Sequence, residues 1–439
     1  MGKETVPGSQ ERRFAAYIEG LAEAAGHADR HAPLKNYCTG LLLPGERKSV
    51  EPMAARLAGD NVRRMHQSLH HVVADAPWSD EAVLDRGLDF VIPALLRRDP
   101  VVAWVVDDTG FPKKGRESVG VARQYCGQVG KQDNCRVAVS LSVTTEKASM
   151  PVAYRLYLPQ SWIDDRPRRK KTGVPDSIRF QTKPQIALDQ IRRACERGIP
   201  PGVVLADAGY GTDTGFRGEL TKRAMSYVVG IQSTTTVWRR GKEPKPAPTH
   251  KGNTGRPRKL LQRDARHQPV SVKQLALSLP TAAWQKVTWR QGAKQKLHSR
   301  FAALRVRPAH RDYWRSEPHP EEWLLMEWPV GEAEPTKYWL STLPADTALV
   351  ELVHLAKHRW IIERDYQELK QELGLGHYEG RGWRGFHHHA TLCIAAYGFL
   401  VTERSRFSPS AQVGHLGLPT PEPSSDFRPR GSPRSSRAA

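Results

Sequence analysis

The sequence Val-Val-Ala-Trp-Val-Val occupies residues 101–106 and runs directly into Asp107 and Asp108. An uninterrupted apolar run of this length predicts a strand that is buried on both faces of a sheet. A second run, Val-Val-Leu-Ala at residues 203–206, ends in the same way at Asp207. A carboxylate at the end of a buried strand is costly unless it is paired or binds a metal. The two runs therefore predict a sheet with acidic residues at two of its strand ends.

The segments around these runs predict the rest of the sheet and its helices. Side-chain periodicity predicts strands at residues 136–145, 152–158 and 227–231 and helices at residues 183–198 and 215–223. Early strands followed by alternating helices and strands are typical of a mixed sheet with helices on its faces. We therefore expect an α/β fold.

A third acidic residue lies on a predicted long helix at residues 346–373, with Asp346 as its N-cap and Gly374 as its stop. Of the acids on this helix, Glu363 stands out because Arg359 lies four residues before it and Lys370 seven residues after it, on the same face. A carboxylate flanked by two cations fits a metal ligand with phosphate-binding groups beside it. A surface ladder of salt bridges is the alternative interpretation.

The composition indicates a polyanionic partner. The chain has 67 Lys and Arg against 46 Asp and Glu, a formal charge of +21. Neutralising phosphates releases counterions, so this excess favours nucleic acid, although a ribosome-associated or simply basic protein is the alternative. The five cysteines are scattered without a Cys-x-x-Cys pair, which fits a reducing cytosol. We expect no secretory signal, because the first residues contain no apolar h-region, and no membrane span, because no apolar run approaches 18 residues.

Changes in pattern along the chain divide it into five expected parts. Helical periodicity precedes the first strand, and we interpret that region as a DNA-recognition domain, with packing or dimerisation as the alternative. Later, a basic loop and strand-like stretches at residues 297–306 and 322–328 predict a mostly β insertion. The expected parts are an N-terminal helical domain at 1–98, a first core segment at 99–232, the β-rich insertion at 233–335, a second core segment at 336–405 and a disordered tail at 406–439.

Three carboxylates on separate elements fit a site for metal-dependent phosphoryl transfer, which uses two divalent cations. Mg²⁺ prefers a few hard carboxylates and keeps its other positions for water and phosphate oxygens. Asp107 is the candidate bridging ligand, and Asp207 and Glu363 each complete one metal. Neighbouring side chains of a strand point to opposite faces, so only one of Asp107 and Asp108 faces the site, and we prefer Asp107. For each acid taken alone, a turn or cap role is the alternative.

Three motifs carry these acids. The first is Asp107-Asp108-Thr109-Gly110-Phe111-Pro112-Lys113-Lys114-Gly115, which residues 118–125 and 156–159 extend, and the second is Ala206-Asp207-Ala208-Gly209-Tyr210-Gly211. The third is Arg359-Trp360-Ile361-Ile362-Glu363 with Lys370. Together they resemble the motifs of bacterial insertion-sequence transposases of the DDE type (the IS seven-hundred-one group, related to the IS four group). The third family motif reads Tyr-x2-Arg-x3-Glu-x6-Lys, and Ala356 stands here where the family has Tyr.

The resemblance implies an RNase H-like core with a β-rich insertion before the third acid. It implies a DNA transposase that cuts transposon ends and joins the freed 3′-hydroxyl to target DNA with two Mg²⁺ ions, for which Mn²⁺ substitutes. The implied partners are double-stranded DNA, as terminal inverted repeats and as target, and a second copy of the chain. The implied location is the bacterial cytoplasm, at the nucleoid. A catalytically inactive DNA-binding regulator and a metal-dependent nuclease are the alternatives.

Several basic and aromatic residues are further candidates for contacts with DNA. Arg359, Lys370, Lys113 and Lys114 lie beside the acidic motifs and are candidates for phosphate contacts. Gly255-Arg256-Pro257-Arg258-Lys259 resembles an AT-hook core, which would lay Arg256 and Arg258 in a narrow minor groove, but a flexible basic linker fits equally well. The insertion holds Trp238, Trp284 and Trp289, for which packing in the core is preferred over stacking on a flipped base. We expect residues 387–389, three consecutive histidines, to face DNA or solvent.

Overall fold

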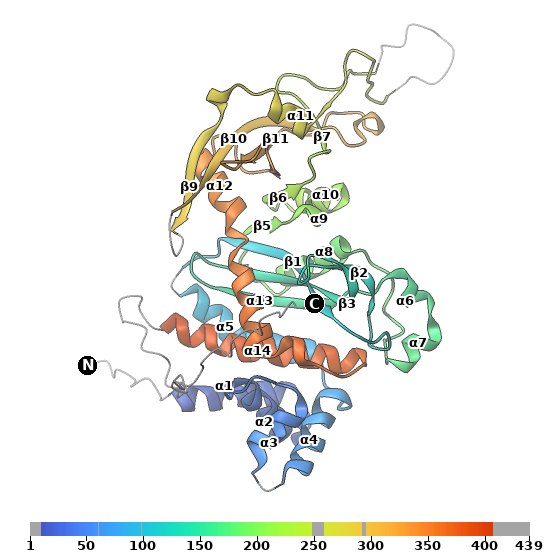
Figure 1. The fold of residues 1–439 in the computed structure, drawn as a ribbon, viewed down its shortest axis with the longest axis vertical. Coiled ribbons are helices and arrows are strands. Elements are labelled where there is room, and N and C mark those ends of the chain that lie inside the picture. Colours follow the sequence, from blue (N-terminus) through green and yellow to red (C-terminus); the bar gives the residue numbers. More distant parts are fainter. Residues whose placement is uncertain (1–9, 60, 98, 248–258, 292–295, 407–439) are drawn as a thin grey trace, which may run out of the picture.

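The computed structural model describes residues 10–59, 61–97, 99–247, 259–291 and 296–406. They build a mixed sheet flanked by helices, with the insertion at one end and the N-terminal helices at the other (Figure 1). The α/β fold expected from the sequence is confirmed, and it is consistent with an RNase H-like core. The candidate AT-hook residues Arg256 and Arg258 and the tail from residue 407 lie outside the described residues.

The sheet has 12 strands, and its main path runs β2-β3-β1-β5-β6-β12-β11-β10-β7-β8. Off this path, β4 pairs with β3 and β9 pairs with β10. The strands are β1 Ala103–Pro112, β2 Ala122–Cys126, β3 Lys131–Thr144, β4 Ser149–Leu156, β5 Val203–Ala206, β6 Tyr227–Ile231, β7 Thr236–Trp238, β8 Val270–Ser271, β9 Gln285–Gln291, β10 Lys296–Pro308, β11 Glu322–Trp328 and β12 Lys337–Ser341. Among the strands that the structure describes, only β1–β5 and β5–β6 pair in parallel. The insertion strands β10 and β11 therefore extend the core sheet beyond β12.

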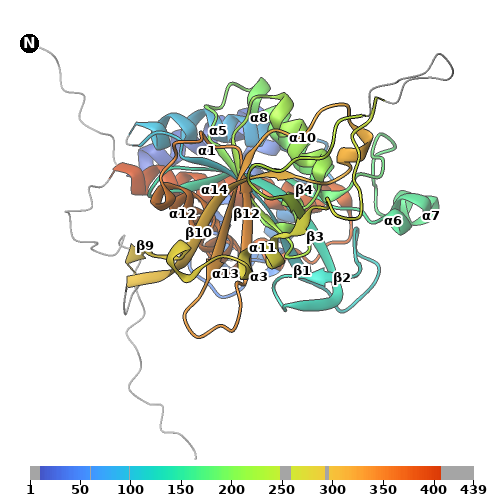
Figure 2. The same ribbon diagram turned by 90° about the horizontal axis from the view of Figure 1, so that it is seen from above.

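Helices cover both faces of this sheet. Those that follow β4 are α6 Gln160–Asp164, α7 Arg166–Lys171, α8 Lys183–Glu196, α9 Ala208–Gly211, α10 Thr214–Lys222, α11 Val272–Leu277, α12 Leu349–His358, α13 Ile361–Gln371 and α14 Trp383–Arg406. Apolar residues of α8 and α10 pack with one set of strand side chains, and those of α12 and the start of α13 pack with the alternate set. Seen from above, α8 and α10 lie on the opposite side of the strands from α13 (Figure 2).

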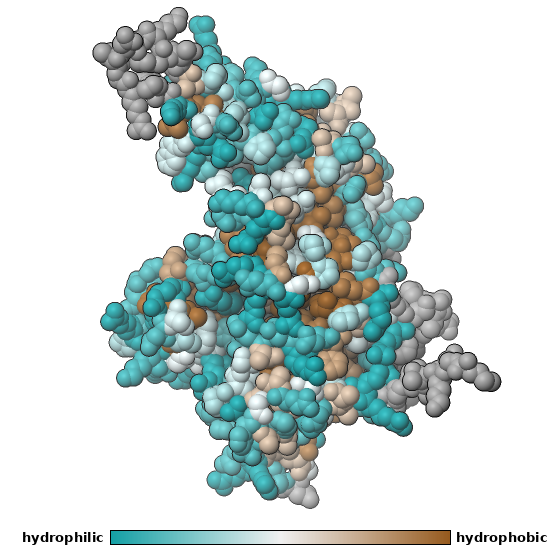
Figure 3. Space-filling model, turned by 180° about the vertical axis from the view of Figure 1, so that it is seen from behind, coloured by the Kyte–Doolittle hydropathy of each residue, from teal (hydrophilic) through white to brown (hydrophobic). Residues whose placement is uncertain are grey.

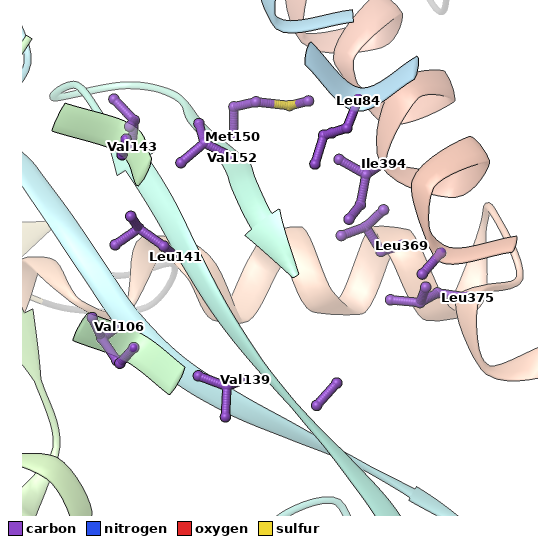
Figure 4. Packing of buried hydrophobic residues seen from close by; sticks show 14 of the residues in the cluster. Leu84, Val106, Val139, Leu141, Val143, Met150, Val152, Leu369, Leu375 and Ile394 are labelled. Atoms are coloured by element: carbon purple, nitrogen blue, oxygen red, sulfur yellow. The ribbon is translucent and has the colours of Figure 1, made fainter. Parts of the chain in front are cut away.

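The N-terminal helices share the core of the sheet domain. They are α1 Gln10–Ala24, α2 His31–Leu42, α3 Val50–Ala58, α4 Val62–Ala74 and α5 Asp80–Leu96. The hydroxyl of Tyr17 donates to the carbonyl of Ala395 on α14, at 2.8 Å, in a buried contact. Leu84 of α5 and Ile394 of α14 point toward Met150 of β4 in one continuous packed layer (Figure 4). This packing favours the packing interpretation of the N-terminal region, and a role in DNA recognition stays a prediction.

A predicted helix differs from the structure in two ways. The long helix predicted at residues 346–373 is interrupted, because α12 ends at His358 and α13 begins at Ile361. Its N-cap is Ala348 rather than Asp346. The helix α2 contains Pro33, which lies in the first turn, where the backbone N–H that proline lacks would have no partner.

The three consecutive histidines are buried, so the expectation that they face DNA or solvent is wrong. Their exposed fractions are 6% for His387, 2% for His388 and 1% for His389. They lie on α14, which is buried along most of its length, as expected for a helix that packs on all sides. Backbone carbonyls accept from their rings, for example that of Gly374 from Nε2 of His389 at 2.9 Å.

The surface is largely hydrophilic on the side opposite to that of Figure 1, with apolar residues gathered in one band at mid-height (Figure 3). In the part of the chain that the structure describes, helices are too short or too polar to cross a bilayer.

Candidate active site

The register of two parallel strands places Asp107 and Asp207 side by side. Val105 of β1 is the partner of Leu205 of β5, and each aspartate lies two residues further along its own chain. Neighbouring strands are separated by about 4.8 Å, so the two aspartates lie at the same level. β5 ends at Ala206, as predicted, but the prediction that the first strand ends at Asp107 is wrong, because pairing with β3 continues β1 to Pro112. Because side chains alternate, Asp107 shares the face of Val105, which packs against α12 and α13.

Asp108 belongs to the other face. Its carboxylate accepts from the ammonium of Lys183, at the start of α8, at 2.8 Å. Asp107 instead meets the α12–α13 face, where Arg359 Nη2 donates to its Oδ1 at 2.8 Å. The sequence alone left open which of Asp107 and Asp108 faces the site. In the structure the two carboxylates lie on opposite faces of the sheet, and Asp107 is the one that contacts Arg359 of the third motif.

Close backbone packing holds Asp207 at its strand end. Asp207 is the N-cap of the short helix α9, and its Oδ1 accepts from the backbone N–H of Gly209 at 2.9 Å. A Cβ atom on Gly230 of β6 would lie 2.9 Å from the nitrogen of Ala208 and 3.1 Å from the carbonyl carbon of Asp207. A Cβ atom on Gly211 would come still closer to the carbonyl oxygen of Gly230. The family-like motif Ala206–Gly211 therefore needs its glycines to bring the chain after β5 against β6.

The interruption between α12 and α13 brings Arg359 of the third motif to Asp107 of β1. The backbone N–H groups of Trp360, Ile362 and Glu363 each bond to the carbonyl three residues earlier. These tight bonds turn the chain at Arg359 and Trp360, so that Arg359 reaches Asp107 while Glu363 begins the first turn of α13.

The charges of all three acids act on the guanidinium of Arg359. Burial lowers the pKa of its guanidinium, but the charges of Asp107, Asp207 and Glu363 outweigh this effect and the pKa is raised overall. Burial is also the main cause that raises the pKa of Asp107 to about 6, opposed by Arg359 and reinforced by Asp108 and Asp207. The charges of all three carboxylates thus act on one guanidinium, and we call Asp107, Asp207 and Glu363 the acidic cluster. That the three come close enough to hold metal ions together stays a prediction.

Glu363 is exposed and lies in the first turn of α13. Among the residues that the structure describes, no cation lies within ion-pairing distance of its carboxylate. The salt-bridge ladder that the sequence left open is therefore not formed with Arg359 or Lys370. Asp207 is exposed as well, and the side chain of Asp107 is 14% exposed. Two of the three carboxylates are therefore accessible from solvent.

The predicted phosphate-binding lysines differ in their surroundings. The ammonium of Lys370 donates to the carbonyl of Gly110 at 3.0 Å, and it lies close enough to Asp107 for that charge to act on its pKa. Lys113 donates to the carbonyl of Tyr378 at 2.9 Å, and burial beside Arg136 lowers its pKa to about 8. Lys114 is exposed. A phosphate contact stays a prediction for each of them.

The tryptophans of the insertion pack in the structure, as preferred from the sequence. Trp238 is buried and its Nε1 donates to Asp312 at 2.6 Å. Trp284 packs edge-on against Trp328, and Trp289 against Phe301. Trp360, next to Arg359, is 36% exposed, and the guanidinium of Arg290 in β9 lies 3.6 Å from the centre of its ring. The insertion thus contacts the chain directly beside the acidic cluster.

The sequence did not predict the buried polar residues that hold α13 against the sheet beside this cluster. Asp365 is buried on α13 and binds the hydroxyls of Ser149 and of Tyr397, the latter at 2.7 Å, and burial raises its pKa to about 6. Tyr366 reaches Ser140, the partner of Asp107 across the β1–β3 pair. Asp365 lies two residues after Glu363, and that spacing puts it on another side of the helix, toward the core. Buried acids of this kind leave no sequence signal, because only tertiary partners distinguish them from exposed ones.

The donor set suits hard divalent cations. Asp207 and Glu363 are exposed, and Asp107 lies on the strand next to the one that Asp207 follows, so these oxygen ligands leave room for water and phosphate oxygens. Arg359 balances only part of the negative charge. The charge of Asp207 acts on Asp107, and negative charge that is not fully balanced is what a metal ion stabilises.

Two comparisons with known proteins bear on this chain. A family model described as "DDE superfamily endonuclease" matches residues 20–296, a range that includes Asp107 and Asp207 and ends before Glu363. A protein of Microchaete diplosiphon named "Probable transposase for insertion sequence element IS701" is 31% identical over 189 residues. That alignment covers 43% of this chain and 45% of the relative, so the match spans about half the length of each.

Proposed function

Because the chain belongs to the DDE superfamily endonucleases, we propose that it is a DNA transposase that cuts transposon ends and transfers the freed 3′-hydroxyl strands to target DNA. One observation carries the proposal. Parallel pairing sets Asp107 and Asp207 at the same level on one face of the sheet, and the α12–α13 turn brings Arg359 and Glu363 to that face.

In this proposal Asp107, Asp207 and Glu363 hold two Mg²⁺ ions, and Mn²⁺ substitutes for them. Such a pair, when bound, activates the attacking oxygen and stabilises the leaving oxygen of an in-line displacement. The residues of the chain position the DNA. Arg359, already within the cluster, offers its guanidinium fork to the phosphate, and Lys370, held by Gly110, offers a second positive charge beside it.

The partners of the proposed reaction are double-stranded transposon ends and target DNA, and the chain acts at the nucleoid in the bacterial cytoplasm. The charge of +21 supports a DNA partner of this kind. Joining two ends at one target calls for two active sites, so we propose a homodimer in the DNA complex. The N-terminal region at 1–98, the core at 99–232 and 336–405 and the insertion at 233–335 remain proposed functional divisions of one continuous sheet-and-helix body.

The alternative that Ala356 favours is an inactive DNA-binding regulator. Ala356 is 9% exposed and packs in the apolar layer of α12, so the tyrosine of the family motif has no replacement at that position. The three carboxylates are nevertheless all present, which favours the enzyme over the regulator. A nuclease that only hydrolyses DNA would use the same cluster without joining strands.

Purified full-length protein incubated with Mg²⁺ and labelled DNA from the flanks of its own gene separates these three functions. The transposase predicts nicks at defined ends together with joined strand-transfer products. Nicks without joined products would indicate a nuclease, and binding without cleavage would indicate the regulator. Either of the last two results would contradict the proposed function.

A further inference from the structure

A second cluster of metal-binding side chains lies away from the three carboxylates. His354 and His358 are four residues apart on α12, so both rings lie on one face of the helix. Glu146 approaches that face from the turn between β3 and β4. One ligand atom from each of the three residues lies within 4.8 Å of the other two.

The contacts within this cluster orient its side chains. Nε2 of His354 lies 3.2 Å from Oε1 of Glu146. Nε2 of His358 lies 3.1 Å from Oγ1 of Thr144, and that hydroxyl donates its own proton to the carbonyl of Ala103 at 3.1 Å. The Thr144 oxygen therefore accepts from the His358 ring. A ligating histidine is commonly held in this way, with one ring nitrogen bonded to an oxygen and the other left for the metal.

The cluster also has an entry side. His358 is buried, while the side chains of His354 and Glu146 are 42% and 49% exposed. The ligand atoms of one tetrahedral zinc ion lie roughly 3.4 Å apart, given metal–ligand distances of about 2.0–2.2 Å. The three ligand atoms lie within 4.8 Å of one another, so the two exposed side chains would move closer to bind one ion, and a water molecule would complete the fourth position.

We propose that Glu146, His354 and His358 form a binding site for a divalent transition-metal ion of the zinc type. Two imidazoles and one carboxylate suit Zn²⁺ and its neighbours, whereas Mg²⁺ prefers oxygen ligands alone. The site is therefore chemically distinct from the Asp107 cluster. A metal here fixes the end of α12 to the β3–β4 turn, one residue before Arg359, and so holds the turn that carries Arg359 to Asp107.

The experiment measures Zn²⁺ binding to the full-length, untagged protein by competition with a chromophoric zinc chelator, after removal of metals. The wild type is expected to bind one more equivalent of Zn²⁺ than the His354→Gln variant. The Glu146→Gln variant is expected to bind this additional Zn²⁺ with at least tenfold lower affinity than the wild type. His27→Gln is the matched control, since His27 is exposed beside Asp29, and it is expected to bind like the wild type. Because His354 and Glu146 are partly exposed, both variants are expected to fold.

A second readout distinguishes this site from the carboxylates. Co²⁺ bound by two imidazoles with low coordination absorbs visible light strongly, whereas Co²⁺ surrounded by six oxygens absorbs weakly. We expect the strong band in the wild type and in Asp107→Asn, and its loss in His354→Gln. The inference is overturned if His354→Gln binds Zn²⁺ as tightly as the wild type, or if the strong band persists in that variant. These outcomes do not depend on whether the protein cleaves DNA.

Discussion

At the scale of single residues, the site depends on a carboxylate that the folded protein holds at a cost. Asp107 is largely buried, and its ion pair with Arg359 does not fully offset the loss of water. The apolar run predicted this strand, but not its length, because β1 continues past Asp107 to Pro112 through its pairing with β3. The sequence could not separate Asp107 from Asp108, because only the helix packed on each face decides which aspartate meets Arg359 and which meets Lys183.

Asp107→Asn is expected to stabilise the metal-free protein at neutral pH. The pKa of Asp107 is about 6 in the folded state against an ordinary value of 3.8, so the folded state favours the neutral form. The resulting penalty is absent below about pH 4, grows between pH 4 and 6, and is complete above pH 6, where it is on the order of 2–3 kcal/mol. Asparagine mimics the neutral form and removes that penalty.

Urea unfolding in the presence of EDTA measures this effect at pH 4 and at pH 7.5. The variant is expected to exceed the wild type in free energy of unfolding at pH 7.5 and to match it at pH 4. Glu351→Gln, an exposed change on α12, serves as the control and is expected to change little at either pH. A less stable Asp107→Asn protein at pH 7.5 would show that Arg359 more than offsets the burial of Asp107.

The same pKa sets the expected pH dependence of metal use. Below about pH 6 a proton occupies Asp107 and competes with the metal, so Mg²⁺-dependent DNA cleavage is expected to fall as the pH drops through this value. Raising the Mg²⁺ concentration should move the midpoint to lower pH. Cleavage rates at several Mg²⁺ concentrations test this, and a midpoint that stays fixed would argue against proton–metal competition at Asp107.

At the scale of elements, two structural features position the acids: the parallel β1–β5 pair and the turn between α12 and α13. The strands were predictable, because apolar runs define them. The turn was not predictable, because residues 346–373 contain neither proline nor glycine inside the helical pattern. Tertiary contacts impose the turn, with Arg359 bonded to Asp107 on one side and Trp360 against Arg290 of the insertion on the other.

Gly230→Ala is expected to reduce DNA cleavage at least tenfold while the protein still folds. The added methyl group would meet the backbone of Asp207 and Ala208, and the chain that carries the second acid has to shift. A displacement of about 1 Å in a catalytic group costs roughly 100-fold in rate, so a smaller shift already has a clear effect.

Gly218→Ala on α10 is the matched control, because a Cβ there meets nothing within 4 Å among the described residues. It is expected to keep full activity and to gain up to about 1 kcal/mol in stability, since alanine favours helices over glycine. Circular dichroism and thermal unfolding establish that both variants fold. Equal cleavage by Gly230→Ala and the wild type would mean that the close approach of β6 does not position Asp207.

At the scale of the whole molecule, a strongly basic chain surrounds an acidic centre. The formal charge of +21 attracts a polyanion, while the three carboxylates repel it until cations are bound. Composition alone therefore favours a polyanionic partner, and DNA as that partner stays a proposal. Composition could not show that the N-terminal helices share one core with the sheet, or that the insertion strands extend that sheet, because pairing and packing between distant segments leave no local pattern.

Binding of the protein to its end DNA is expected to weaken steeply with salt. Each phosphate that the protein neutralises adds about 0.9 to the slope of log affinity against log salt concentration. Fluorescence anisotropy across a range of salt concentrations measures this slope. Asp107→Asn is expected to keep the slope of the wild type, because Asp107 acts at the acidic centre and not on the basic surface. A flat salt response would contradict a phosphate-binding surface.

Metal-dependent cleavage and joining of labelled end DNA by a panel of site variants tests the central claim most directly. The rates of cleavage and of joining are each expected to fall at least 1,000-fold in Asp107→Asn, Asp207→Asn and Glu363→Gln. This corresponds to a loss on the order of 4 kcal/mol of transition-state stabilisation. DNA binding by these variants is expected to be kept. The exposed control Glu351→Gln is expected to cleave and join like the wild type. Normal cleavage by Glu363→Gln, or by either aspartate variant, would contradict the claim that these three carboxylates form one catalytic metal site.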